Sequence, residues 1–103
     1  MMCGVKGGLE PMNTALRILI VDDDDGIRTF LPDFLQQGMH FSHVATAENG
    51  FRALEHLERA LNKEQPCNIV ISDFAMPKMN GAALLKKIRA DERFNGTQFI
   101  LMS

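Results

Sequence analysis

The sequence lacks the features that would place it in a membrane or on a nucleic acid. Its longest runs of apolar residues have four or five members, whereas a membrane-spanning helix needs roughly 20. Lys and Arg number 11 against 13 Asp and Glu, which gives a net charge of −2. Without a basic excess there is no general attraction to nucleic acid. We therefore expect neither a membrane segment nor direct binding of nucleic acid.

Cysteine is scarce as well, since Cys3 and Cys67 are the only two in the chain. They do not have the close spacing of a cysteine-ligated metal site, so free thiols in a reducing compartment are the simpler interpretation. Residues 1–15 are rich in glycine and contain no continuous apolar core of a signal peptide. We expect a disordered N-terminal lead over 1–15 and, by default, a cytoplasmic protein.

What remains is the composition of one small globular domain, with 103 residues of which 46% are apolar and 23% charged. Short apolar runs alternate with segments of helical periodicity. The predicted strands cover 17–21, 40–47, 68–72 and 99–102. The predicted helices cover 26–37, a segment from 50 that ends before Pro66, and 82–90. Such alternation is typical of an α/β domain, a doubly wound parallel sheet with helices on both faces.

The first predicted helix is amphipathic, and its ends carry recognisable signals. Asp24 or Asp25 can cap its start, Gly38 is placed to cap its end, and Pro32 predicts a kink. The apolar residues at helical spacing are Ile27, Phe30, Leu31, Phe34 and Leu35. The second helix opens at Asn49-Gly50, and its apolar positions are Phe51, Ala53, Leu54, Leu57 and Leu61. We expect both apolar faces to pack on the sheet.

Acidic residues follow two of the predicted strands. Asp22–Asp25 follow the first strand, and Asp73 follows the third. These strands are neighbours in a doubly wound sheet, so Asp22, Asp23 and Asp73 are expected to converge at one edge. Three carboxylates with no basic residue nearby in sequence predict a divalent cation, and oxygen ligands favour Mg²⁺. The alternative is a solvated acidic turn that caps a helix, with Asp73 in an Asx turn.

These residues also carry a resemblance to a known family. The motifs that carry it are Val21-Asp22-Asp23 after one buried strand, Ile71-Ser72-Asp73 after another, Met76-Pro77, Gly81, and Ser103 thirty residues beyond Asp73. With these motifs in register, the chain resembles a receiver domain of a two-component response regulator, the CheY-like family, over about residues 16–103. The resemblance implies a flavodoxin-like sheet with strand order 2-1-3-4.

The resemblance also implies a role for each matching residue. Asp73 would accept a phosphoryl group from a sensor histidine kinase, a phosphotransfer protein or a small phosphodonor. Asp23 and Asp73 would bind Mg²⁺ directly, Asp22 mostly through water, and the backbone carbonyl of Ala75 would be another ligand. Ser103 would hydrogen-bond the phosphoryl oxygen as a switch hydroxyl. Such a module is no enzyme, because at most it catalyses its own phosphorylation and dephosphorylation.

The family pattern continues with a fifth strand that begins near a lysine, and with two more helices, whereas this sequence ends at Ser103. We therefore expect an incomplete receiver domain over 16–103, truncated after the fourth strand. The exposed fourth strand would allow a homodimer. Two alternatives remain open. One is a truncated, non-phosphorylated fragment that acts only as an interaction module or has no function. The other is a haloacid-dehalogenase-type phosphatase, although Asp73-Phe74-Ala75 lacks the second acid of its Asp-x-Asp pair.

Overall fold

The computed structural model describes residues 16–39, 41 and 43–102, in which strands and helices alternate along the chain. The predictions for the lead 1–15, for His40 in the second strand and for Ser103 lie outside the described residues. The strands are β1 (Arg17–Val21), β2 (His43–Ala47), β3 (Ile69–Asp73) and β4 (Gln98–Met102). The helices are α2 (Asp25–Asp33), which continues as the π-helix η1 (Phe34–Gly38), α3 (Gly50–Asn62), α4 (Gly81–Arg89) and the short 3₁₀ helix η2 (Glu92–Phe94).

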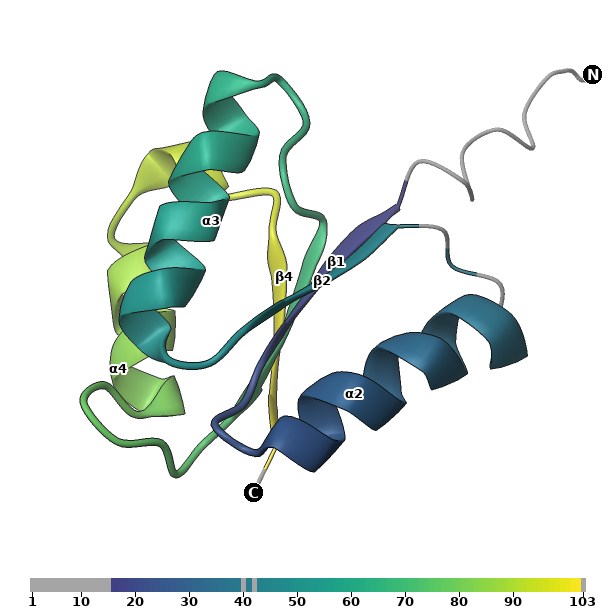
Figure 1. Ribbon diagram of the computed structural model, residues 1–103. Helices are drawn as coiled ribbons and strands as arrows, with labels where there is room; N and C mark the ends of the chain where they lie inside the picture. Colours follow the sequence, from purple (N-terminus) through teal and green to yellow (C-terminus); the bar gives the residue numbers. More distant parts are fainter. Residues whose placement is uncertain (1–15, 40, 42, 103) are drawn as a thin grey trace, which may run out of the picture.

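The four strands form one parallel sheet in the order β2-β1-β3-β4. Helix α2 lies on one face of the sheet, and α3 and α4 lie on the other (Figure 1). The predicted doubly wound α/β architecture and its strand order are therefore confirmed. None of the helices among the described residues is long and apolar enough to cross a membrane.

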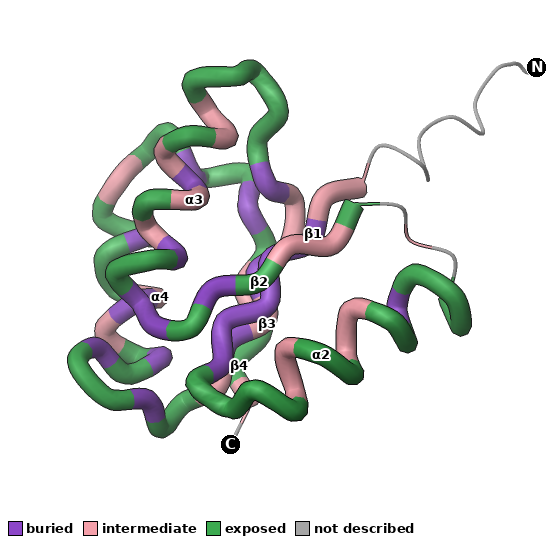
Figure 2. The backbone as a smooth tube through the Cα atoms, viewed as in Figure 1, coloured by how far each residue is buried: buried purple, intermediate pink, exposed green. Residues whose placement is uncertain are grey.

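The side chains of the central strands alternate between the two faces of the sheet, as the geometry of a strand requires. Leu19 and Val21 belong to the larger core beneath α3 and α4, whereas Ile18 and Ile20 belong to the smaller core beneath α2. Burial is concentrated along β1 and β3, while α2 is mostly exposed (Figure 2). A fully buried Leu or Ile contributes about 1.5–3 kcal/mol relative to an exposed one, so β1, which buries Leu19 and Ile20 completely, forms the stable centre of the domain.

The prediction that the whole apolar face of α2 packs on the sheet is wrong. Phe30 and Phe34 are 63% and 49% exposed, and their rings stack on each other at 6.1 Å. No residue of α2 itself is buried, and in the following π-helix only Leu35 is. Within the described part of the chain, α2 and its π-helical end are what covers this face of the sheet, and the sheet meets only part of their apolar surface.

The end of the same helix also differs from the prediction. Pro32 lies inside α2, and two residues later the chain widens into a π-helix that the Met39 N–H closes on the Phe34 oxygen at 3.2 Å. Met39 with φ −116° therefore ends the helix, and Gly38 is not its C-cap. No glycine among the described residues has a positive φ. The extra residue per π turn moves the helix end beyond the position that an α-helical count predicts.

Helix α3 begins where the sequence predicts. Asn49 caps it by accepting a hydrogen bond from the Arg52 N–H at 2.9 Å, and Ala53 and Leu57 are buried against the sheet. Phe51 is 52% exposed, so its predicted place on the packed face is wrong. It stands in the first turn of the helix, where the chain has just left the sheet.

Candidate functional site

The predicted acidic residues meet at the carboxyl end of the sheet. Val21 and Ser72 are register partners on the adjacent strands β1 and β3, so the next residue on each strand, Asp22 or Asp73, reaches the same edge. Carboxylate oxygens of Asp22, Asp23 and Asp73 all lie within 4.8 Å of one another. The strand order thus brings together groups that are 50 residues apart in the sequence.

Asp22 is the buried member of this cluster, with 6% of its surface exposed. Burial raises the pKa of its carboxyl, the hydrogen bond from the Asp24 N–H at 2.9 Å acts in the opposite direction, and the charges of Asp73 and Asp23 raise the pKa further. The folded chain therefore concentrates negative charge in a partly desolvated place. A bound cation would relieve that repulsion.

The other two aspartates of the run serve the start of α2. Asp24 is its N-cap and accepts hydrogen bonds from the N–H groups of Gly26 and Ile27, at 2.7 and 3.2 Å. Asp25 is exposed and pairs with Arg28 one turn later. Of the two capping residues that the sequence allowed, the structure selects Asp24. The four aspartates thus divide into two that reach the cluster, one helix cap and one partner of an ion pair.

Arg28 is the residue near the site that sequence reasoning missed. Its guanidinium donates to the backbone oxygen of Asp22 at 2.8 Å and pairs with Asp25. The expectation that no basic residue lies nearby is therefore wrong, because one helical turn folds Arg28 back over the end of β1. Its spacing from Asp25 was the available signal, since residues three apart share a helix face. Among the described residues its side chain contacts a backbone oxygen and Asp25, so no ion pair links it to the three clustered carboxylates.

The loop after β3 is held firmly beside Asp73. The N–H of Phe74 donates to the Met102 oxygen at 2.8 Å, and the N–H of Gly81 donates to the Phe74 oxygen at 2.8 Å. Met76 and Met79 are buried in the larger core and anchor the loop from below. These contacts fix the main chain around Asp73 and so restrict the orientation of its side chain.

Two backbone features define the shape of this loop. Lys78 has φ 71°, and the Met79 N–H closes a tight turn around it on the Pro77 oxygen at 2.7 Å. A Cβ at Gly81 would lie 2.4 Å from the backbone oxygen of Asp73 and 2.5 Å from the Leu101 side chain. Only glycine lets the start of α4 approach the carboxyl end of β3 this closely.

The donor set of the cluster fits a hard divalent cation. Its available ligands are carboxylate oxygens, which suit Mg²⁺ better than a soft transition metal, and Asp22, Asp23 and Asp73 are the residues that would hold it. Ala75 lies exposed in the loop after β3, and ligation by its carbonyl stays a prediction. The switch role of Ser103 also stays a prediction, because that residue lies outside the described part of the chain.

Comparison with known proteins points in the same direction. The protein-family model for the response regulator receiver domain matches residues 18–103 of the sequence. The chain is 33% identical over 88 residues to chemotaxis protein CheY1 of Helicobacter pylori. This match covers 85% of this chain and 67% of that protein. It is 34% identical over 88 residues to a probable chemotaxis protein CheY of Rhizobium etli, covering 85% of this chain and 64% of that protein. The chain thus spans about two thirds of the length of these relatives.

A solved structure extends the similarity to the arrangement in space. The receiver domain of the histidine kinase CKI1 from Arabidopsis thaliana, complexed with Mg²⁺, superposes with a TM-score of 0.75 at 27% identity. The match covers 88% of this chain and 71% of that one. The similarity thus extends over most of the chain.

Proposed function

The chain belongs to the response regulator receiver family, and we propose on this premise that it accepts a phosphoryl group on Asp73 in a two-component phosphorelay. One observation carries the proposal: Asp73 ends a central strand with its carboxylate within 4.8 Å of those of Asp22 and Asp23. Carboxylates clustered at a partly buried strand end cost folding free energy, and such groups are typical of functional sites.

The chemistry follows from what these residues offer. An Asp73 oxygen attacks phosphorus in line, an O–P bond forms, and the P–N bond of a phosphohistidine donor breaks, leaving the electron pair on the imidazole. The loop hydrogen bonds at Phe74 and Gly81 hold the carboxylate in position. Bound Mg²⁺ would supply neutralisation of the negative charge that accumulates between the carboxylates and the phosphoryl group.

The family resemblance supplies the ligand roles in this proposal. Asp23 and Asp73 would bind Mg²⁺ directly and Asp22 mostly through water, and the proximity of their carboxylates supports these roles. We assign a further ligand to the carbonyl of Ala75 and the switch hydroxyl to Ser103. The hydrogen bond from the Asp24 N–H keeps one Asp22 oxygen oriented, so that the other is left for the site.

The partner in this function is a sensor histidine kinase or a phosphotransfer protein, and a small phosphodonor is an alternative source. The chain acts as a phosphoacceptor and not as an enzyme on other molecules. A phosphatase of the haloacid-dehalogenase type is disfavoured, because Ala75 stands where its second acid belongs. The cytoplasmic location of this chain and the absence of direct nucleic acid binding stay predictions from the sequence.

The test is the intact mass of the chain after incubation with Mg²⁺ and acetyl phosphate. We expect a gain of one phosphoryl group that needs Mg²⁺ and disappears in Asp73→Asn. The matched control is Asp33→Asn, the same substitution at an exposed residue outside the cluster, which should be phosphorylated normally. A folded chain that gains no mass would favour the non-phosphorylated fragment, and gain of mass in Asp73→Asn would move the acceptor elsewhere.

A homodimer through β4 is a second proposal, and it depends on a separate observation. Ile100 and Leu101 are 51% and 40% exposed on β4, the outer strand of the described sheet. Apolar side chains on an unpaired strand favour pairing with another strand. Light scattering should show a mass that rises with protein concentration and falls in Ile100→Lys. A constant monomer mass would end this proposal and leave the phosphoacceptor role untouched.

A further inference from the structure

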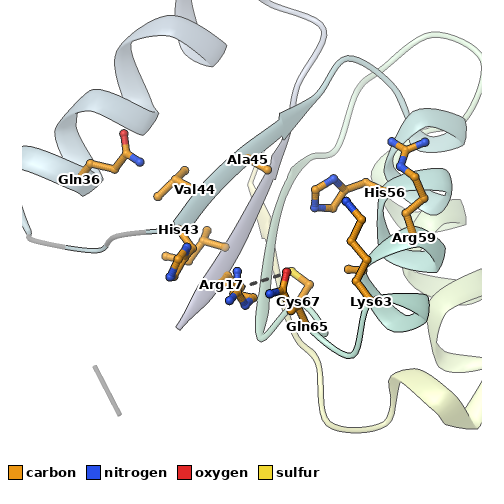
Figure 3. Close-up of a pocket in the computed structure, with 12 residues that line it drawn as sticks. Arg17, Gln36, His43, Val44, Ala45, His56, Arg59, Lys63, Gln65 and Cys67 are labelled. Atoms are coloured by element: carbon orange, nitrogen blue, oxygen red, sulfur yellow. Dashed lines mark hydrogen bonds between the residues drawn. The ribbon is translucent and has the colours of Figure 1, made fainter. Parts of the chain in front are cut away.

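A hollow lies at the amino end of the sheet, the end opposite the acidic cluster. Its volume is about 400 Å³, and it lies around the start of β2, between α3 on one side and Gln36 of the π-helix on the other (Figure 3). Its apolar lining comes from both faces of the sheet: Ile18 and Val44 lie on the side of α2, whereas Ala45, Ala60 and Cys67 lie on the side of α3 and form the apolar floor beside the cations. We call this hollow, with its lining residues, the basic groove.

The polar part of the lining has one sign of charge. Arg17, Arg59 and Lys63 carry permanent positive charge, His43 and His56 add two imidazoles, and none of the twelve lining residues is acidic. In Figure 3 His56 and Lys63 extend from α3 toward the strand edge, with Arg59 beside them. In a chain of net charge −2, this concentration of cations is local and needs a cause.

The cations of the basic groove also differ from the other arginines in their partners. Among the hydrogen bonds and ion pairs between described residues, none uses the side chain of Arg17, Arg59 or Lys63. Every other arginine has acceptors: Asp25 and the Asp22 oxygen for Arg28, Glu55 for Arg52, the Phe94 and Thr97 oxygens for Arg89, Glu58 and Asp91 for Arg93. The fold thus supplies acceptors for its arginines elsewhere and not in the groove.

The environment of His56 reports the same positive field. Burial lowers the pKa of its imidazole, and the charges of Arg59 and Lys63 lower it further. The side chain is therefore held neutral beside two cations, and it can donate or accept a hydrogen bond at the groove wall.

We propose that the basic groove binds a small organic anion that carries more than one negative charge, either a phosphate ester or a polycarboxylate. The volume lies in the range of small-molecule sites, about 300–1,000 Å³. The guanidinium groups match the geometry of phosphate and carboxylate oxygens, and the apolar floor accommodates the organic part. This site lies at the other end of the sheet from Asp73, so it does not depend on phosphorylation of that residue.

The first test is a calorimetric and amide-NMR titration with adenosine monophosphate, citrate and the neutral control adenosine, at one ionic strength. We expect saturable binding of at least one of the two anions, with amide shifts at 17–18, 43–45 and 56–63, and no saturation with adenosine. Adenosine monophosphate alone would identify the phosphate ester, citrate alone the polycarboxylate, and both a site selective for multiple charge. Failure of both anions, or equal binding of adenosine, would overturn the proposal.

The second test compares two double variants, each of which reverses the charge of two basic residues and is made in the Asp73→Asn chain. Arg59→Glu with Lys63→Glu should weaken anion binding about tenfold or more. Lys86→Glu with Lys87→Glu makes the same charge change on exposed residues in the last turn of α4 and should leave binding unchanged. Equal losses in both pairs would show general charge attraction and no site. If the first pair unfolds the chain, Arg59→Gln with Lys63→Gln provides the same comparison without new negative charge.

Discussion

The two ends of the sheet carry opposite charges and are built by different means. At the carboxyl end, Asp22, Asp23 and Asp73 are short side chains placed by the strands and by main-chain hydrogen bonds. At the amino end, Arg59 on α3 and Lys63 at its C-cap are long, exposed side chains. The short side chains of the first arrangement have few rotatable bonds, whereas the long side chains of the second have many. Substitutions should therefore be tolerated far less at the carboxyl end.

The largest effect should come from the glycine that lets α4 approach β3. In Gly81→Ala the new Cβ would lie 2.4 Å from the backbone oxygen of Asp73, so the free energy of unfolding should fall by about 1–3 kcal/mol. Urea unfolding measures it. Gly96→Ala is the matched control, since its Cβ would meet nothing within 4 Å, and it should change stability by less than about 0.5 kcal/mol. Equal effects at both positions would contradict the tight packing of this end.

The next effect is on the affinity for Mg²⁺. Asp23→Asn removes an exposed carboxylate of the cluster, so calorimetric titration with MgCl₂ should show binding about tenfold weaker, which corresponds to about 1.4 kcal/mol. Asp25→Asn removes the same charge two residues later, from a side chain that pairs with Arg28. It should bind Mg²⁺ nearly as the unmodified chain does. Loss of equal size in both would indicate general charge attraction.

A gain of stability is expected at Asp22. Asp22→Asn removes a buried charge but keeps the oxygen that accepts from the Asp24 N–H, so without Mg²⁺ the free energy of unfolding at pH 7 should rise by about 1 kcal/mol. The folded-state pKa of Asp22 lies above its ordinary 3.8. The protonated Asp22 carboxyl is therefore the form that favours the folded state. Its contribution to stability is complete below pH 3.8 and is lost as the pH rises through the raised pKa of the folded chain.

The advantage of Asp22→Asn should accordingly be small near pH 3 and grow toward pH 7. Urea unfolding at a series of pH values measures it. Saturating Mg²⁺ should reduce the advantage, because the cation offsets the same charge in the unmodified chain. An advantage that does not depend on pH would show that the ionised carboxyl is not its source.

The smallest effect concerns the arginine beside the acidic cluster. Arg28→Gln loses a hydrogen bond to the Asp22 oxygen and the pair with Asp25, so unfolding should become easier by about 0.5–1 kcal/mol. Arg52→Gln breaks the exposed pair with Glu55 and should change stability by less than about 0.5 kcal/mol. A difference in the opposite direction would mean that the backbone contact of Arg28 does not support the end of β1.

The sequence was sufficient for the sheet and for the place of the acidic cluster. Alternation of apolar runs with helices predicts a doubly wound sheet, the family resemblance implies its strand order, and together they bring Asp22 and Asp73 to one edge. The signals for the helix starts are equally local, as Asn49 shows by capping α3. Such features depend on a few adjacent residues and on general rules of topology.

The remainder depends on packing that local patterns do not contain. Phe30 has the spacing of a core residue but is exposed, because the sheet meets only part of the apolar arc of α2. The π-helix after Pro32 adds a residue to the turn, so the helix ends beyond the position that α-helical periodicity predicts. The basic groove joins Arg17, His43 and Lys63 from three separate elements, and no spacing in the sequence predicts their meeting. Surfaces assembled from distant segments need the fold.

One measurement tests the central claim, that the carboxyl end of the sheet is a cation site, most directly. Backbone amide spectra are recorded while MgCl₂ is added to the unmodified chain and to Asp23→Asn. The account predicts saturable shifts at 21–24 and 72–75, weakened in the variant, with the amides of Arg17, His43 and Lys63 unmoved. Shifts that do not saturate, or that are the same in both chains, would contradict it.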